Sequence, residues 1–464
     1  MSREQAISAA AEHFDSGDFL KDLSRRVAIR TESQLYEERK PDMEAYMAEM
    51  RAALEPMGYV CEQFPNPSPK GGPFLIATRH EGDNLPTVLT YGHGDVVRGM
   101  EGQWAEGRDP WTLTEVGERV YGRGTVDNKG QHSINIAGLN AVLKTRGKLG
   151  FNSKILIESG EESGSPGLAD FAKQQKAKLK ADFLIASDGP RISADHPTVF
   201  MGSRGAYPMD ITCDLREGAH HSGNWGGLLA NPAVILAHAL ASIVDRRGQI
   251  RVPEWRPTTL TPAIRAALAE CELEAEANGP QIDPNWGEES LTPIERVIGW
   301  NSFEILAYTA GLPDKPVNAI PGRATCRGQL RFVVGTDPED IVPALRRHLE
   351  REGFPMVTVA DADRGYMKAT RLDPDHALVQ WAAGSIQRTT NKKTAILPNL
   401  GGSLPNDVFS EILGLATIWV PHSYASCSQH APNEHALKPI LREGLQLTAG
   451  LFWDIGDGTL PESW

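Results

Sequence analysis

The chain has 464 residues, of which 40% are hydrophobic and 23% charged, and its formal net charge is −13. This composition is ordinary for a globular protein, and the length exceeds the roughly 250–300 residues of a single core, which predicts two domains. The negative charge argues against non-specific binding of nucleic acid or anionic membranes. No apolar run approaches the ~20 residues that cross a bilayer, and the N-terminal segment does not have the pattern of a secretory signal.

The cysteines are scattered, odd in number and without a CxxC pair: Cys61, Cys213, Cys271, Cys326 and Cys427. The pattern therefore predicts neither a disulfide framework nor a thiolate zinc site. We expect a cytoplasmic protein, because the cytoplasm keeps thiols reduced.

The first part of the chain alternates short apolar runs with helical stretches. Helices are expected at 42–57, 129–145 and 165–180. Strands buried on both faces are expected at 73–78, 86–91, 154–159 and 182–187. This alternation predicts the α/β class, with a mainly parallel sheet and helices on both of its faces.

From about residue 206 the pattern becomes more mixed and predicts a smaller α+β domain inserted into the first. Its expected strands are 206–215, 303–308 and 324–334, and its expected helices are 231–246, 262–277 and 338–352. A helix is expected after 373–376, and the tail 395–456 is expected to return to buried strands such as 414–420. We therefore predict a larger domain split between 1–205 and 371–464, with the smaller domain inserted at 206–370.

The expected strand 86–91 runs directly into the sequence Gly92-His93-Gly94-Asp95. Ligands of parallel sheets bind beyond the carboxyl ends of the strands, so this is a favourable place for a site. His93 offers a neutral imidazole to a metal ion, and the carboxylate of Asp95 could orient its ring. The structural alternative is a strand-end histidine held in a turn.

A second motif, GRGTVDNKG, spans residues 122–130 before an expected helix. It is neither a GxxxxGK[ST] loop nor a GxGxxG fingerprint, and the carboxylate of Asp127 would repel a phosphate. Asp127 could instead bridge two cations. The alternative is that it caps the following helix.

Further candidate ligands follow other expected strands. Glu161 and Glu162 come after strand 154–159, where adjacent carboxylates are costly unless a cation or proton compensates them. One of them would bind metal while the other moves protons, and a solvated acidic loop is the alternative. With Asp188 after strand 182–187 and His430 near the C-terminus, the chain offers nitrogen and oxygen ligands that suit zinc and similar ions.

Together the motifs GHGD, DNKG, ESGEESGS, SDGP and HAPNE resemble a dinuclear-zinc metallopeptidase family. This family contains carnosine dipeptidase, acetylornithine deacetylase, succinyl-diaminopimelate desuccinylase and the glutamate carboxypeptidases. The resemblance covers essentially the whole chain, and the GEESGS block is closest to the carnosinase-like dipeptidases.

The resemblance implies a role for each candidate. The implied metal ligands are His93 and Asp188 for one ion, Glu162 and His430 for the other, and the bridging Asp127. Asp95 is implied to orient His93, and Glu161 to act as general acid and base. The bond between Asp127 and Asn128 is expected to be cis. His435 is the rival of His430, which is preferred because it precedes an acidic residue by four positions.

The resemblance extends to residues around the substrate. AHHSGNWGG, at 219–227, resembles a lid segment whose histidine reaches the partner subunit's active site, which is His221 here with His220 as the alternative. The histidine would stabilise the oxyanion of the tetrahedral intermediate. Asn318, where the dipeptidases carry Thr, and Arg331 match residues that grip the substrate. The loop with Gly402 and Ser403 resembles the one that binds the substrate's C-terminal carboxylate. A surface cation is the alternative for Arg331.

The implied activity is metal-dependent hydrolysis of an amide bond in a small substrate, a dipeptide with a free C-terminal carboxylate. We expect two divalent metal ions per subunit, zinc with manganese or cobalt as alternatives, and a homodimer through the inserted domain. An N-acyl-amino-acid deacylase is the alternative among hydrolases. A non-catalytic metal-binding relative and a nucleotide-dependent enzyme are the alternatives of other classes. The sequence does not predict the preferred side chains, or α- against β-linked dipeptides.

Overall fold

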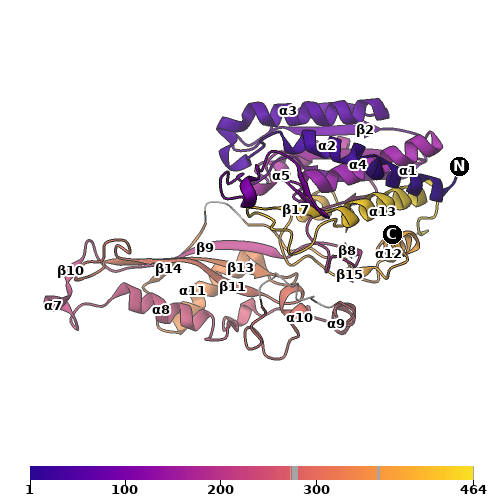
Figure 1. Ribbon diagram of the computed structural model, residues 1–464. Coiled ribbons are helices and arrows are strands. Elements are labelled where there is room, and N and C mark those ends of the chain that lie inside the picture. The colour runs from indigo at the N-terminus through magenta and orange to yellow at the C-terminus, as the bar shows by residue number, and fades with distance from the viewer. Residues whose placement is uncertain (272, 274–280, 363–365, 463–464) are drawn as a thin grey trace.

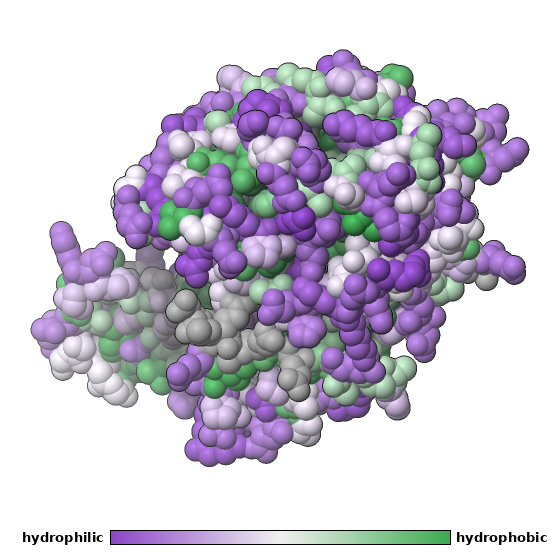
Figure 2. Space-filling model, turned by 45° about the vertical axis from the view of Figure 1, so that its right-hand side comes forward, coloured by the Kyte–Doolittle hydropathy of each residue, from purple (hydrophilic) through white to green (hydrophobic). Residues whose placement is uncertain are grey.

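The computed structural model describes residues 1–271, 273, 281–362 and 366–462. The chain forms a larger body, which holds both termini, and a smaller elongated body beside it (Figure 1). The larger body contains an eight-stranded sheet and the smaller one a four-stranded sheet. On the face shown in Figure 2, hydrophilic residues cover most of the surface and hydrophobic residues form separate patches. None of the helices in the described part of the chain has the length and apolar character of a membrane span.

The eight-stranded sheet has a mainly parallel centre. In spatial order its strands are β1 (Val60–Phe64), β2 (Phe74–Arg79), β6 (Asn152–Glu158), β3 (Thr87–His93), β7 (Phe183–Ala186), β16 (Ala416–Trp419), β8 (Thr198–Phe200) and β15 (Ala395–Leu397). Strands β6, β3, β7 and β16 pair in parallel, whereas β2 and β8 run antiparallel to their inner neighbours. All four strands expected in the first part of the chain are present, and the predicted sheet is confirmed.

Helices cover both faces of this sheet, as predicted. The helices of the larger body are α1 (Arg3–Asp15), α2 (Asp18–Val27), α3 (Tyr36–Leu54), α4 (Lys129–Arg146), α5 (Leu168–Gln174), α6 (Lys176–Leu179), α12 (Ala377–Thr390) and α13 (Lys438–Gly456). Helices α3, α4, α12 and α13 share one hydrophobic cluster with the sheet. A second cluster, on the other face, contains α5 and a π-helix at Val408–Ile412.

Two expectations for this body were wrong in detail. The tail does not return to strands throughout, because 438–456 forms the long helix α13. This helix is buried on nearly all sides, so it lacks the polar stripe by which an amphipathic helix is recognised. The single helix expected at 165–180 is divided into α5 and α6. Helix α5 begins only after Gly167, because the φ of +84° at Gly167 is a left-handed conformation that does not belong to a helix.

The smaller body is an antiparallel sheet covered by helices. Its strands are β11 (Ser302–Ala310), β13 (Arg323–Phe332), β9 (Gly205–Asp214) and β14 (Val357–Asp361), with helices α8 (Pro232–Ile243) and α11 (Ile341–Arg351) packed on it. A two-stranded ribbon, β10 (His220–His221) with β12 (Ala319–Ile320), lies at its far end beside α7 (Ser222–Trp225) (Figure 1).

Two short helices after α8 belong by packing to the larger body. Helices α9 (Pro262–Ala269) and α10 (Pro293–Ile298) contribute Ile264, Leu268 and Ile298 to the cluster on the second face of the large sheet. The helix expected at 262–277 ends at Ala269, and residues 272 and 274–277 lie outside the described part of the chain.

Candidate functional site

The ends of three adjacent parallel strands bring most of the predicted residues together. His93 is the last residue of β3, and Asp188 follows β7 by two residues. After β6, a short turn of 3-10 helix contains Glu161 and Glu162. Because β6, β3 and β7 are neighbours in the sheet, these side chains meet at one edge, as the strand-end argument predicts.

Asp127 reaches the same place from the loop between β5 (Arg119–Tyr121) and α4. Its bond to Asn128 is cis, as expected. The cap of α4 is Asn128 rather than Asp127, so the helix-capping alternative for Asp127 is wrong. The side chain of Asn128 donates to the carbonyl oxygen of Ser187 at 2.8 Å, which ties the loop to the end of β7.

A buried carboxylate from the C-terminal motif also holds this loop. Glu434 is fully buried and accepts hydrogen bonds from the backbone N–H groups of Gly124 at 2.9 Å and Val126 at 3.2 Å. Its other oxygen lies 2.6 Å from Nη1 of Arg123, which is equally buried. Glu434, the acidic residue of HAPNE, therefore helps to hold the Asp127 loop although it lies 307 positions later in the chain.

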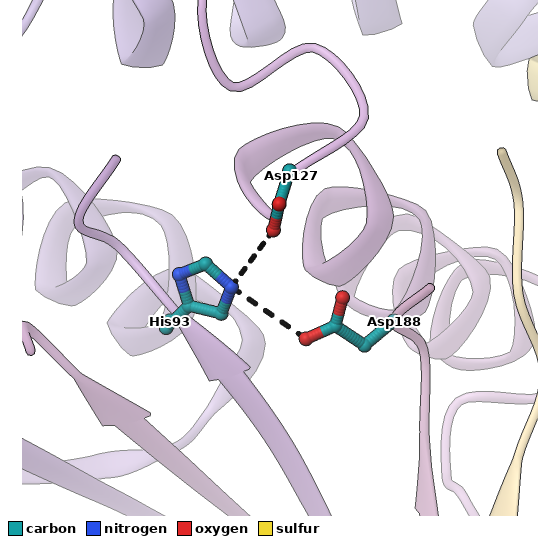
Figure 3. A group of neighbouring side chains, drawn as sticks. All are labelled: His93, Asp127 and Asp188. Atoms are coloured by element: carbon teal, nitrogen blue, oxygen red, sulfur yellow. Dashed lines mark ion pairs between the residues drawn. The ribbon is translucent and has the colours of Figure 1, made fainter. Parts of the chain in front are cut away.

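The predicted ligands form two groups that share Asp127. In the first, Nε2 of His93 lies 3.1 Å from Oδ1 of Asp127 and 3.5 Å from Oδ2 of Asp188 (Figure 3). In the second, Nε2 of His430 lies 2.8 Å from Oδ2 of Asp127 and 3.0 Å from Oε2 of Glu162. The ligand atoms of each group lie within 4.8 Å of one another. One carboxylate thus offers an oxygen to each group.

Asp95 is fully buried and organises the site in a way that the sequence did not indicate. Nδ1 of His93 lies 3.1 Å from the backbone carbonyl oxygen of Asp95, closer than the 3.5 Å to its carboxylate. The carboxylate itself accepts the backbone N–H groups of Glu161 and Glu162, each at 3.1 Å. Asp95 therefore fixes the ring of His93 and the turn with the paired glutamates at once.

The site gathers several carboxylates that are largely buried. Burial raises the pKa of Glu161 well above its usual value, and the charges of Glu162 and Asp188 add to this. Burial also raises the pKa of Glu162 to about 8. For Asp127, burial acts in the same direction, but the hydrogen bond from His430 and the neighbouring imidazole of His93 outweigh it and lower its pKa. Such a group of carboxylates favours a bound cation.

The polar atoms at the centre of the site fit metal ions. Three buried atoms, Nε2 of His93, Oδ2 of Asp188 and Oε1 of Glu162, have no hydrogen-bond partner among the described residues. Neutral imidazole and carboxylate are the ligands of zinc and similar divalent ions. The rival histidine is engaged elsewhere: Nε2 of His435 lies 2.6 Å from the hydroxyl of Tyr424, and the ring is part of neither group.

A cavity of about 680 Å³ opens from the metal groups toward the smaller body. Glu161 lines it with 12% of its side chain exposed, whereas only 3% of the Glu162 side chain is exposed. Gly402, Ser403 and Arg331 line the same cavity, and Nη1 of Arg331 donates to the hydroxyl of Ser403 at 2.7 Å. The structure therefore joins these three predicted substrate residues to the metal groups.

His221 and Asn318 lie elsewhere. His221 is exposed in β10, at the far end of the smaller body (Figure 1). The carbonyl oxygen of Asn318 accepts hydrogen bonds from the backbone N–H and the hydroxyl of Ser222, so Asn318 lies beside this ribbon. Neither residue lines the cavity of its own chain. The expectation that Asn318 grips the substrate alongside Arg331 is thus not met within one subunit.

Two residues at the site were missed from the sequence. Gln429 precedes His430 and donates from Nε2 to Oδ2 of Asp127 at 2.5 Å. Arg204 is 9% exposed and donates from Nε to the carbonyl oxygen of Gly401 at 2.7 Å. Position next to a predicted ligand could have pointed to Gln429, whereas the sequence around Arg204 carries no such signal.

Arg331 lines one end of the cavity, and Arg204 lies close behind it without lining the cavity itself. Burial lowers the pKa of Arg204 to about 10, and the nearby charge of Arg331 acts in the same direction. Burial also lowers the pKa of Arg331. The hydrogen bonds described for these two guanidinium groups run to hydroxyl and carbonyl oxygens rather than to carboxylates, and the charge of Glu304 acts on Arg204 alone. This end of the cavity therefore suits an anion supplied from outside the chain.

The sequence profile of the peptidase family M20/M25/M40 matches residues 89–454, most of the chain and all the residues of the two metal groups. The chain belongs to this family. Membership makes it one of the metallopeptidases that the motifs indicated, and the resemblance is confirmed.

Two relatives of this chain carry the names of dipeptidases. The chain is 28% identical to the Beta-Ala-His dipeptidase of Mus musculus over 407 residues, 82% of this chain and 80% of the relative. It is 24% identical to the cysteinylglycine-S-conjugate dipeptidase of Corynebacterium striatum, covering 71% of this chain and 72% of the relative.

Solved structures show the same fold. Human carnosine dipeptidase 1 covers 98% of this chain and 100% of its own, with a TM-score of 0.78 and 24% identity. The di-peptidase Dug1p of Saccharomyces cerevisiae covers 98% of this chain and 99% of its own, with a TM-score of 0.80 and 21% identity.

Proposed function

We propose that this member of the M20/M25/M40 family is a metal-dependent dipeptidase that cleaves dipeptides with a free C-terminal carboxylate. The main support is that a single cavity is lined by three features. These are the two ligand groups that share Asp127, the side chain of Glu161, and the hydrogen-bonded pair of Arg331 and Ser403. The dipeptidase names of the relatives support the same activity.

The proposed metal centre holds two divalent ions, with zinc as the expected metal. His93 and Asp188 would hold one ion, Glu162 and His430 the other, and Asp127 both. When bound, such a pair of ions supplies Lewis acidity and an activated water molecule. The imidazole, carboxylate and buried setting of each group support zinc, and manganese and cobalt accept the same ligands.

Glu161 is the proposed general acid and base. Its side chain faces the cavity, and its Oε2 lies 3.9 Å from Nε2 of His93, so it stands beside the ligand group without being part of it. A carboxylate in this position can accept the proton of an attacking water and return it to the leaving nitrogen. Burial, which disfavours its charged form, assists the delivery of that proton.

The far end of the dipeptide would be held by cations. Arg331 and Ser403 offer a guanidinium and a hydroxyl to the C-terminal carboxylate, and Arg204 holds the loop at Gly401 in place. Charge-assisted hydrogen bonds of this kind position a substrate for reaction as well as binding it.

We further propose a homodimer through the inserted domain of residues 206–370. The outer strand β11 is an unpaired sheet edge with exposed apolar side chains, among them Ile305 at 46% and Leu306 at 57% exposed. Such an edge is a template for pairing with a second copy. His221 and Asn318 lie together on the ribbon beyond it, so both would reach the partner's cavity, where His221 would stabilise the oxyanion.

A cytoplasmic location fits this proposal. All five cysteines are buried and unpaired, which suits a reducing compartment. None of these five cysteines belongs to the proposed metal centre, whose ligands are nitrogen and oxygen atoms alone.

The replacement Glu161→Gln tests the activity. It is expected to abolish dipeptide hydrolysis while two metal ions stay bound, which metal analysis of the purified variant measures. The control Glu411→Ala, at an exposed surface pair, should keep full turnover. Retained hydrolysis in the Gln variant, or loss of both ions from it, contradicts the assigned role.

Mixing two inactive variants tests whether His221 completes the active site of the partner subunit in the proposed dimer. Glu161→Gln and His221→Ala subunits are each expected to be inactive as homodimers and to regain part of the activity when mixed. This recovery requires a site built from both subunits. Two inactive proteins that stay inactive after verified subunit exchange would contradict the proposal.

A further inference from the structure

The cavity wall between the metal groups and Arg331 is apolar. Leu400 lies at the centre of this wall. Its side chain packs against Gly189, next to the ligand Asp188, where an added Cβ atom would meet it at 2.8 Å. A Cβ on Gly402 would meet the same side chain at 3.5 Å. Leu400 therefore spans from the metal end of the cavity to the loop that carries Ser403.

A second apolar side chain stands over that loop. Val297, near the end of α10, lies against Gly401, where an added Cβ would meet its Cγ1 at 2.8 Å. Val297 is 39% exposed and lines the cavity, so part of its apolar surface is uncovered. Ile192 and Met367 line the same cavity from the two bodies. Uncovered apolar surface in a cavity is what an apolar ligand group would bury.

The charged groups of the cavity are already committed. Among the described lining residues, three carboxylates are proposed metal ligands, Glu161 is the proposed acid and base, and Arg331 is assigned to the substrate's carboxylate. The remaining cation, Arg191, lies 2.7 Å from Glu443 and is 2% exposed. A charged substrate side chain would therefore lose its water here without gaining a partner.

We propose that this wall selects dipeptides whose C-terminal residue has a large apolar side chain, such as leucine, methionine or phenylalanine. The inference rests on the proposed function, because it places the scissile carbonyl at the metal centre and the C-terminal carboxylate at Arg331. The residue between these two points is the C-terminal one. Its side chain then faces the wall formed by Leu400 and Val297.

A panel of Ala-Xaa dipeptides tests the preference in the metal-loaded enzyme. Ala-Leu and Ala-Phe are expected to exceed Ala-Ala in kcat/KM by about tenfold or more, the usual effect of filling an apolar pocket. Ala-Lys and Ala-Asp should fall below Ala-Ala. Equal values across the panel, or a preference for a charged residue, would overturn the inference while leaving the dipeptidase activity intact.

The replacement Val297→Glu tests the wall itself. It should raise the ratio of Ala-Lys to Ala-Leu hydrolysis at least tenfold, because the new carboxylate can pair with the lysine side chain. The matched control is Val60→Glu on β1, where the valine is 68% exposed and outside the cavity. An unchanged ratio in a folded Val297→Glu enzyme would contradict the assignment of the wall.

Binding separates this inference from the proposed activity. In the metal-loaded Glu161→Gln protein, calorimetry should show tighter binding of Ala-Leu than of Ala-Lys by about tenfold. If the unmodified enzyme hydrolyses no dipeptide but this binding preference is found, the proposed dipeptidase activity is wrong, whereas the proposed preference for an apolar C-terminal residue is supported. Equal affinities would overturn the wall whatever the activity.

Discussion

The replacement Glu434→Ala should destabilise the larger body strongly, because it removes the buried anchor of the Asp127 loop. Three contacts would be lost: Nη1 of Arg123 at 2.6 Å and the N–H groups of Gly124 and Val126 at 2.9 and 3.2 Å. Breaking a buried ion pair by removing one partner costs ~3–5 kcal/mol, since the other charge stays buried and uncompensated. The unsatisfied N–H groups act in the same direction.

Urea unfolding of the metal-free proteins, followed by circular dichroism, measures this loss of stability. The control is Glu411→Ala, whose partner Lys368 lies at 2.8 Å with 41% of its side chain exposed. A surface pair of this kind contributes ~1 kcal/mol or less. The reasoning is refuted if Glu434→Ala costs no more unfolding free energy than the control.

Other predictions concern the metal centre and the substrate. The replacement Asp95→Ala should weaken metal binding ~10–100-fold, measured by chelator competition, because the turn with Glu161 and Glu162 loses the carboxylate that accepts its backbone N–H groups; unchanged affinity would contradict this role. Arg331→Met should raise KM for Ala-Leu with a smaller change for Ala-Leu amide, which lacks the carboxylate. An equal change for both substrates would argue against the assigned carboxylate contact. Metal removal should lower the unfolding temperature, because the buried carboxylates lose their compensating cations, and a scan with and without chelator measures it.

The residues at the strand ends could be predicted because a run of apolar residues, and the residues that directly follow it, can be recognised from the local sequence. An apolar run predicts a buried strand, and the residues just after parallel strands meet at one edge, which placed His93, Glu162 and Asp188 correctly together. The position of Asp127 depended on the resemblance, since the sequence alone left helix capping open.

The remaining features depend on contacts between distant segments. Arg204 is recognisable only once the loop at Gly401 folds against it, and Glu434 only once its carboxylate meets the loop before α4. Helix α13 escaped prediction because burial on nearly all sides removes the amphipathic pattern. The distance of His221 from the cavity of its own chain follows from the length of the smaller body, which periodicity does not reveal.

Calorimetric titration of zinc into the metal-free protein tests the central claim, that Asp127 serves two metal ions, most directly. We expect two ions per chain in the unmodified protein and in the control His435→Ala, and the loss of tight binding at both sites in Asp127→Ala. A single ion per chain, or two ions bound with unchanged affinity by Asp127→Ala, would contradict the account.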